Sequence, residues 1–324
     1  MPSITLSCAF ATSAASHEHA RVAEDLGYTR AWFYDSPALY PDVWVQLCRA
    51  AERTRRIGLG PGVLVPSLRH PMTNAAAIAT LASIAGAERV AVAVGSGFTG
   101  RFTLGQRPMK WVDVVKYVQT LRTLLRGEQA EWEGGLLQML HPEGYGAPRP
   151  IEVPFVIAAA GPKGVAAAQA HGDGIFAAPM PIPGFAWSIA LTFGTVLADG
   201  ESAASARVLA AAGHAAPVLF HFAMENRRLG LLPNGEAWAA AYADVPPRAR
   251  HLALHDRHLI AVNDRDRPFV TGELLTQNGL ALSAAGWRER VDMLASMGAT
   301  EIAYQPAGPD IAGELERFAR AVRG

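Results

Sequence analysis

The chain has 324 residues, of which half are hydrophobic and 18% are charged, enough to bury a large core or to form one α/β barrel with insertions. Its formal net charge is zero, so the charge balance does not indicate a nucleic acid or an anionic membrane as partner. The two cysteines, Cys8 and Cys48, lie in apolar runs, which fits a reducing compartment. We find no signal-peptide pattern and no apolar run long enough to span a bilayer, and therefore expect a cytoplasmic protein.

Short apolar runs alternate with alanine-rich amphipathic segments along most of the chain. The predicted strands cover residues 4–10, 31–34, 57–65, 90–94, 155–159, 175–177, 191–196 and 301–305. The predicted helices cover residues 17–25, 44–53, 72–84, 112–126, 164–171, 287–297 and 311–322. This order is typical of parallel strands joined by crossover helices. Eight strands favour a closed (β/α)₈ TIM barrel, with a doubly wound open sheet as the competitor.

Two regions depart from this repeat. Residues 131–138 predict a small hairpin with Gly134 and Gly135 at the turn. Residues 202–278, approximately, form a long and partly helical insertion before the last strand, rich in histidine and arginine. Such additions to barrels usually surround the catalytic mouth or form an oligomer interface. No linker composition separates the insertion from its surroundings, so we expect one domain over residues 1–324.

The ends of the predicted strands carry the candidate chemistry, because TIM-barrel active sites lie at strand C-termini. The third strand breaks at Pro66 and runs through Arg69 and His70 to a second proline. The fourth ends in Gly95-Ser96-Gly97, where glycine allows either a close ligand or an ordinary tight turn. The second ends at Asp35, which can orient a ligand or act as a base, or can serve as a turn residue before a proline.

The end of the fifth strand resembles an anion site. Ala160-Gly161-Pro162-Lys163 begins a helix, and proline suits its first turn. Free N–H groups and the helix dipole favour an anion there, and Lys163 adds a full positive charge. The segment accommodates a phosphate, or is a tight turn with an exposed lysine.

Three histidines of the insertion, His251, His255 and His258, fall at helical spacing on one face. Such spacing can supply metal ligands, but the surrounding arginines would repel a cation. We therefore predict no metal, and expect His255 and His258 to line the substrate mouth or to join a structural polar network. The sequence has no convincing Ser/His/Asp triad, P-loop or thiolate motif. This pattern favours a cofactor that brings its own chemistry.

Three segments together resemble the bacterial luciferase-like superfamily. They are residues 62–71 (GVLVPSLRHP), residues 89–97 (RVAVAVGSG), and residues 159–163 (AAGPK) with residues 171–176 (HGDGIF). Within that superfamily, the chain is most similar to the methylenetetrahydromethanopterin-reductase-like branch, which includes enzymes that use the deazaflavin coenzyme F420. The resemblance runs over nearly the whole chain but is poor between Ser202 and Asn278.

This resemblance implies a (β/α)₈ barrel, usually a homodimer, that holds F420 or FMN at the strand C-termini. It also implies a non-proline cis peptide at Gly62–Val63, against the cofactor ring, with Asp35 near the ring as the catalytic candidate. The other implied cofactor contacts are Gly95, Ser96 and Gly97 around the ring, Ala160, Gly161, Pro162 and Lys163 at the phosphate, and Phe176. Phe98 and Ser36 stand where some relatives carry an acid and a histidine, so the proton donor stays unassigned.

We therefore expect an F420-dependent oxidoreductase that moves a hydride between reduced deazaflavin and a C=C or C=N bond of a small organic substrate. The alternative is an FMN-dependent luciferase-like monooxygenase, because a reduced flavin also activates oxygen. A hypothesis of another class is a metal-dependent TIM-barrel hydrolase that uses the three histidines and Asp256. A further one is a binding protein that kept the barrel without a cofactor.

Overall fold

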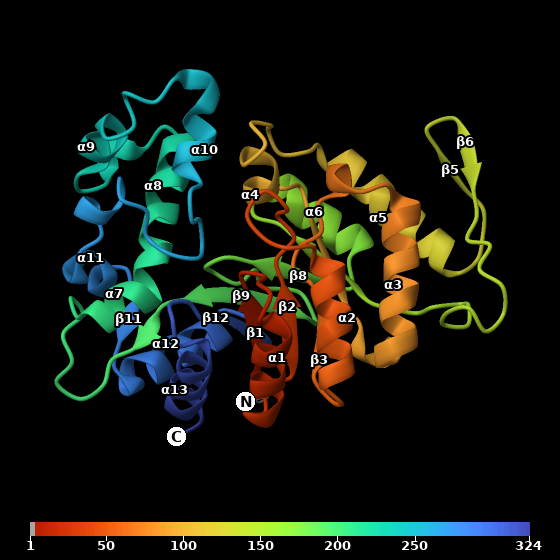
Figure 1. The fold of residues 1–324 in the computed structure, drawn as a ribbon, viewed down its shortest axis with the longest axis horizontal. Helices are drawn as coiled ribbons and strands as arrows, with labels where there is room; N and C mark the ends of the chain where they lie inside the picture. Colours follow the sequence, from red (N-terminus) through yellow and green to blue (C-terminus); the bar gives the residue numbers. More distant parts are fainter. Residues whose placement is uncertain (1–3) are drawn as a thin grey trace.

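The computed structural model describes residues 4–324 and shows a barrel of parallel strands with helices around it (Figure 1). The strands of the main sheet are β1 (Thr5–Phe10), β2 (Arg30–Phe33), β3 (Gly58–Pro61), β4 (Val92–Gly95), β7 (Phe155–Ala158), β8 (Gly174–Ala177), β9 (Ser188–Phe193) and β12 (Glu301–Gln305). Their order is β3-β2-β1-β12-β9-β8-β7-β4. Parallel bridges from Leu59 to Val90 and from Leu64 to Val94 join the two ends of this sheet. The prediction of a TIM barrel is confirmed.

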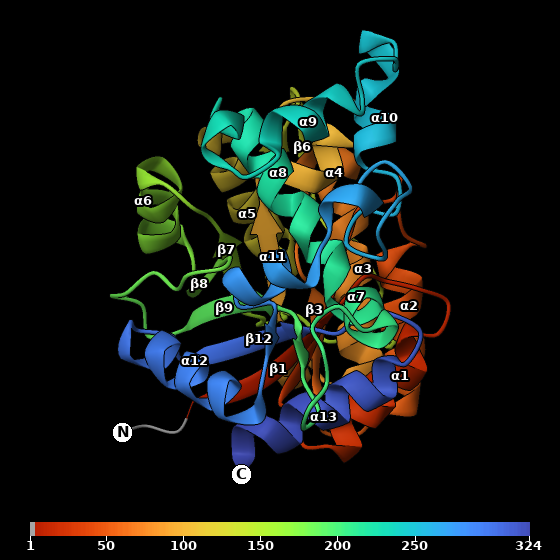
Figure 2. The ribbon, with the colours of Figure 1, turned by 90° about the vertical axis from the view of Figure 1, so that its left-hand side faces the viewer.

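The helices that follow the strands lie outside the sheet (Figures 1 and 2). They are α1 (Ser16–Asp25), α2 (Val43–Arg53), α3 (Pro71–Ala85), α5 (Trp111–Leu125), α6 (Pro162–His171), α12 (Ala284–Ser296) and α13 (Ile311–Arg323). A short additional helix, α4 (Phe98–Phe102), follows β4 directly. Pro71 and Pro162 occupy the first turns of their helices, where a missing N–H costs nothing.

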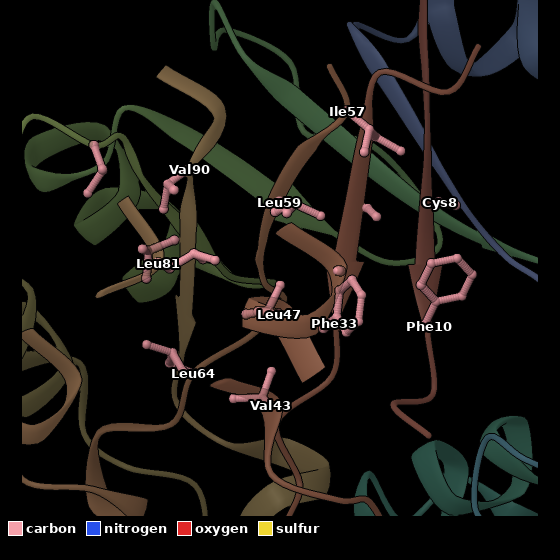
Figure 3. Packing of buried hydrophobic residues seen from close by; sticks show 14 of the residues in the cluster. Cys8, Phe10, Phe33, Val43, Leu47, Ile57, Leu59, Leu64, Leu81 and Val90 are labelled. Carbon is pink, nitrogen blue, oxygen red and sulfur yellow. The ribbon is translucent and has the colours of Figure 1, made fainter. Parts of the chain in front are cut away.

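Two hydrophobic clusters hold the barrel together. The larger one lies between the sheet and the helices, where Cys8 and Phe33 from strands meet Leu47 of α2 and Leu81 of α3 (Figure 3). The smaller one fills the inside of the barrel with side chains such as Trp32 and Phe176. Because strand residues alternate between the two faces, neighbours such as Trp32 and Phe33 contribute to different clusters.

Several predicted boundaries were wrong, and the third strand ends at Pro61 and not at Val65. The hairpin strands are β5 (Ala130–Trp132) and β6 (Gly135–Leu137), so the turn is Glu133-Gly134, both with positive φ, and Gly135 already belongs to β6. The seventh strand begins at Ser188 and ends before Gly194, whose φ is 127°. A side chain at Gly194 would meet the carbonyl oxygen of Leu280. After this close approach the chain leaves the barrel as β10 (Thr195–Val196) and pairs with β11 (Ala281–Leu282).

The insertion forms a helical body that in Figure 1 stands on the opposite side of the barrel from α3 and α5. Its helices are α7 (Ala206–Ala212), α8 (Ala216–Glu225), α9 (Gly235–Ala240), α10 (Arg250–Leu254) and α11 (Gly272–Gln277). Residues 206–225 form one helical stretch that is long and apolar enough to cross a membrane. However, 61% of its most apolar window is buried inside the fold, as in the core helix of a soluble protein.

Candidate active site at the barrel mouth

The C-terminal end of the barrel carries an accessible apolar floor. Its members pack on the cluster inside the barrel yet are only partly buried: Ala11, Leu39, Val63, Ala158, Leu191 and Leu259. Most lie on a strand or just beyond its end, whereas Leu259 comes from the insertion. An apolar surface at this end of a barrel suits a flat ligand.

An ion pair stands at one edge of this floor. Asp35 follows β2 with its side chain only 1% exposed, and its Oδ2 lies 2.5 Å from Nη1 of Arg69. The other Arg69 nitrogen, Nη2, lies 2.8 Å from Oδ2 of Asp42. Burial raises the pKa of Asp35, although Arg69 opposes that shift. Its second oxygen, Oδ1, is buried and has no hydrogen-bond partner among the described residues, which leaves an acceptor for a ligand.

The backbone of Arg69 is held from outside the barrel. Tyr117 on α5 donates a hydrogen bond of 2.8 Å to the Arg69 carbonyl, and Asn74 on α3 donates to the Tyr117 hydroxyl over 2.7 Å. Burial works against the charge of Arg69, but Asp35 and Asp42 more than offset it and raise its pKa. The guanidinium is therefore a fixed cation whose charge is already balanced.

The predicted cis peptide at Gly62–Val63 is present. A side chain added at Gly62 would lie 3.0 Å from Cβ of Trp32, and one added at Gly95 would lie 3.0 Å from Cγ2 of Val63. Gly97 has φ 87° and packs on Val65. The three glycines thus let neighbouring strands and side chains approach, while contact of Gly95, Ser96 and Gly97 with a cofactor ring stays a prediction.

The segment before α6 has the features expected of an anion site. Gly161 has φ 95°, and no atom lies within 4 Å of a side chain added there. The exposed amides of Ala160, Gly161 and Lys163 donate to no acceptor within residues 4–324. Pro162 stands at the first turn of α6, and the Lys163 side chain is exposed. The space beside Gly161 is therefore open, and binding of a phosphate here stays a prediction.

Phe176 lies inside the barrel. It is 5% exposed, and its ring meets Trp32 edge-to-face with centroids 5.4 Å apart. It therefore supports the floor from below.

The histidine prediction needs correction. Helix α10 ends at Leu254 and Arg257 has φ 56°, so His251, His255 and His258 do not share one helical face. His255 and His258 instead converge on His221 of α8, with ring centroids 5.1–5.2 Å apart. Burial lowers the pKa of His221 to about 3, so it is neutral at physiological pH. Within the described part of the chain, no group of side chains is arranged to hold a metal ion.

His258 connects the insertion to the barrel. Its Nε2 lies 3.3 Å from Oγ1 of Thr99 on α4, and Tyr40 donates a hydrogen bond of 3.0 Å to its carbonyl. Burial, followed by the neighbouring imidazoles, holds the pKa of His258 well below its ordinary value. His255 and His258 thus reach the region of the mouth as neutral side chains. Their contact with substrate stays a prediction.

A separate cavity of about 550 Å³ lies between the 66–71 turn, α5 and the hairpin. Arg69 and Lys116 line it together with Asp113 and Glu133. Because these formal charges cancel, the cavity does not resemble the phosphate site before α6.

Comparisons with known proteins agree with this geometry. Residues 11–258 match the family model for luciferase-like monooxygenases. The 5,10-methylenetetrahydromethanopterin reductase of Archaeoglobus fulgidus is 30% identical over 162 residues, which is 48% of this chain and 47% of that protein. The match thus spans about half the length of that relative.

Two solved structures share the fold. The coenzyme F420-dependent tetrahydromethanopterin reductase of Methanopyrus kandleri superposes with a TM-score of 0.67 at 17% identity, over 99% of this chain and 98% of that one. The oxygenating constituent of 3,6-diketocamphane monooxygenase from Pseudomonas putida, in complex with FMN, superposes with a TM-score of 0.59 at 12% identity, over 98% of both chains. The chain belongs to the luciferase-like monooxygenase family.

Proposed function

We propose that the protein is an F420-dependent oxidoreductase that transfers a hydride between reduced deazaflavin and a C=C or C=N bond of a small organic substrate. The observation that carries this proposal is the set of free amides before α6, beside an apolar floor edged by Asp35. A cofactor with a flat ring and a phosphate-bearing side chain needs these two features. The similarly folded Methanopyrus kandleri reductase is F420-dependent, which supports deazaflavin over flavin.

The residues have distinct roles in this proposal. The amides of Gly161 and Lys163 bind the phosphate, and the Lys163 ammonium adds attraction that solvent weakens. Asp35 offers Oδ1 to an N–H at the ring edge, and Arg69 keeps this carboxylate in place. The apolar floor excludes water from the ring face. The bound deazaflavin supplies the hydride chemistry.

The alternative cofactor is FMN, which the structurally similar Pseudomonas monooxygenase binds. The two possibilities separate in one titration of the purified protein with F420 and with FMN, followed by intrinsic tryptophan fluorescence. We expect F420 to bind at least about tenfold more tightly, a difference of about 1.4 kcal/mol. Preferential FMN binding with oxygen consumption by the reduced enzyme would assign the protein to the monooxygenases.

We further propose a cytoplasmic homodimer, as the sequence predicts. Sedimentation velocity of the purified protein tests the oligomeric state.

A further inference from the structure

One segment of the insertion enters the barrel mouth in an unusual backbone conformation. Arg257 and Leu259 have φ values of 56° and 59°. For a residue with a bulky side chain, this left-handed region costs on the order of 1–2 kcal/mol. Such a conformation persists only where its surroundings enforce it, and it is often found at ligand sites.

Side chains of the barrel hold this segment in place. Gln305, at the end of β12, donates a hydrogen bond of 2.8 Å from Nε2 to the Leu259 carbonyl. Its Oε1 accepts a hydrogen bond of 2.9 Å from Tyr34, the residue after β2. Tyr40 donates to the carbonyl of the preceding residue, His258. Because Gln305 and Tyr34 are buried, these bonds fix the segment to the rigid part of the fold.

The Leu259 side chain is the member of the apolar floor that the insertion contributes. It packs against the cluster inside the barrel, together with Val63 and Leu191, and remains only partly buried. Leu259 therefore contacts the interior cluster and is also accessible to solvent at the mouth. Within the described residues of the insertion, no other side chain belongs to this cluster.

The side chains described around the mouth offer no unpaired cation outside the phosphate site. The Arg69 cation is paired with Asp35 and Asp42. The imidazoles of His255 and His258 are buried, and burial lowers the pKa of each. An anionic substrate would lose hydration here without gaining an opposite charge, which is costly.

We propose that Leu259 is a specificity-determining residue that forms one wall of the substrate compartment, and that the substrate is an uncharged, mainly apolar small molecule. This inference rests on the proposed hydride transfer at the same mouth. The left-handed backbone and its bonds to the barrel place a leucine where a mobile loop would leave open space.

The test compares the binding of two uncharged cyclic ketones of different ring size with the binding of a cyclic carboxylate. Cyclohexanone, cyclooctanone and cyclohexanecarboxylate are titrated into wild type and Leu259→Ala, with ligand-observed NMR as the readout, and F420 affinity is measured in parallel. Leu252→Ala is the matched control, because Leu252 lies in the same insertion on α10 and is 59% exposed.

We expect wild type to bind cyclohexanone more tightly than the carboxylate. Leu259→Ala should shift the preference about tenfold toward cyclooctanone, with F420 affinity unchanged, whereas Leu252→Ala should change neither. Tighter binding of the carboxylate by wild type, or no binding of either ketone, would overturn the substrate class. An unchanged ring preference in Leu259→Ala would overturn the role of Leu259.

One further variant and the parallel F420 titration keep these outcomes separate. Asparagine tolerates the left-handed backbone. Leu259→Asn should therefore weaken cyclohexanone binding through the polarity of the new side chain. If wild type fails to bind F420 but the ring preference shifts as expected, the proposed function fails while the role of Leu259 stands.

Discussion

Arg69 bridges the ends of two adjacent strands by placing Nη1 2.5 Å from Oδ2 of Asp35, a residue 34 positions earlier in the chain. The Asp35 side chain is almost completely buried, and the Arg69 side chain is 14% exposed. The carboxylate at the edge of the mouth therefore depends on a cation from the next strand end. Neither residue alone would make a stable buried charge.

Replacing the cation should be costly. Arg69→Gln leaves the Asp35 carboxylate buried and unpaired, so we expect the free energy of unfolding to fall by about 3 kcal/mol in urea denaturation at neutral pH. Arg320→Gln, which breaks an exposed pair with Glu316, should have almost no effect. The double variant Asp35→Asn/Arg69→Gln should recover part of the loss. If the free energy of unfolding falls no further in Arg69→Gln than in Arg320→Gln, burial of the Arg69–Asp35 pair contributes nothing.

The site before α6 can be tested by charge alone. Gly161→Asp and Gly161→Asn add side chains of equal size to the same φ of 95° and the same open space, so both carry the same backbone strain. Only Asp repels a phosphate. We expect F420 affinity to fall at least about tenfold further in Gly161→Asp than in Gly161→Asn, by fluorescence titration. Equal affinities of the two variants would place the phosphate elsewhere.

The sequence predicted the barrel well because its strands and helices are specified locally. The strand over residues 301–305 was correct to the residue, and Pro162 correctly marked the first turn of α6. The insertion was harder to predict. The spacing of His251, His255 and His258 indicated one helix. However, the left-handed backbone at Arg257 breaks the helical geometry between His255 and His258. Positive φ at arginine has no signal in a single sequence.

The candidate site shows the same limit. Asp35 and the segment containing Arg69 could each be identified, because both follow predicted strands. Their pairing could not be predicted, because it depends on the closed barrel. His221 was missed for the same reason, because its ring meets that of His258 from a segment that is distant in the sequence. Its own neighbours on α8 are apolar. The candidate phosphate site before α6 was easier to propose, since one short segment contains all its donors; phosphate binding there stays a prediction.

Acid should destabilise the protein through its buried histidines. Burial lowers the pKa of His214 to about 4, whereas a histidine in the unfolded chain has a pKa of about 6.5. The unfolded state therefore binds a proton first as pH falls, so stability is complete above pH 6.5 and is lost progressively down to about pH 4. At pH 5, His214 alone should cost roughly 2 kcal/mol.

Urea denaturation at pH 7.5 and pH 5.0 measures this loss. His214→Phe removes the titrating group, and Phe193 already packs against its ring, so this variant should lose less stability on acidification than wild type. His141→Gln changes a partly exposed histidine that is not one of the buried histidines. This variant should lose as much stability on acidification as wild type does. An identical loss in wild type and His214→Phe would place the acid sensitivity elsewhere.

The opposite end of the barrel should matter for stability and not for cofactor binding. Glu301, at the start of β12, accepts hydrogen bonds from the indole nitrogens of Trp32 at 3.0 Å and Trp187 at 2.8 Å. The Arg30 guanidinium lies over both rings, 5.3 and 5.5 Å from their centroids. Glu301→Gln keeps one acceptor but turns an amide NH₂ toward the other indole N–H. We expect a loss of about 2 kcal/mol in the free energy of unfolding. F420 affinity should not change, because the active sites of such barrels lie at the C-terminal ends of the strands. A variant of normal stability that binds F420 weakly would show that the two ends of this barrel are coupled.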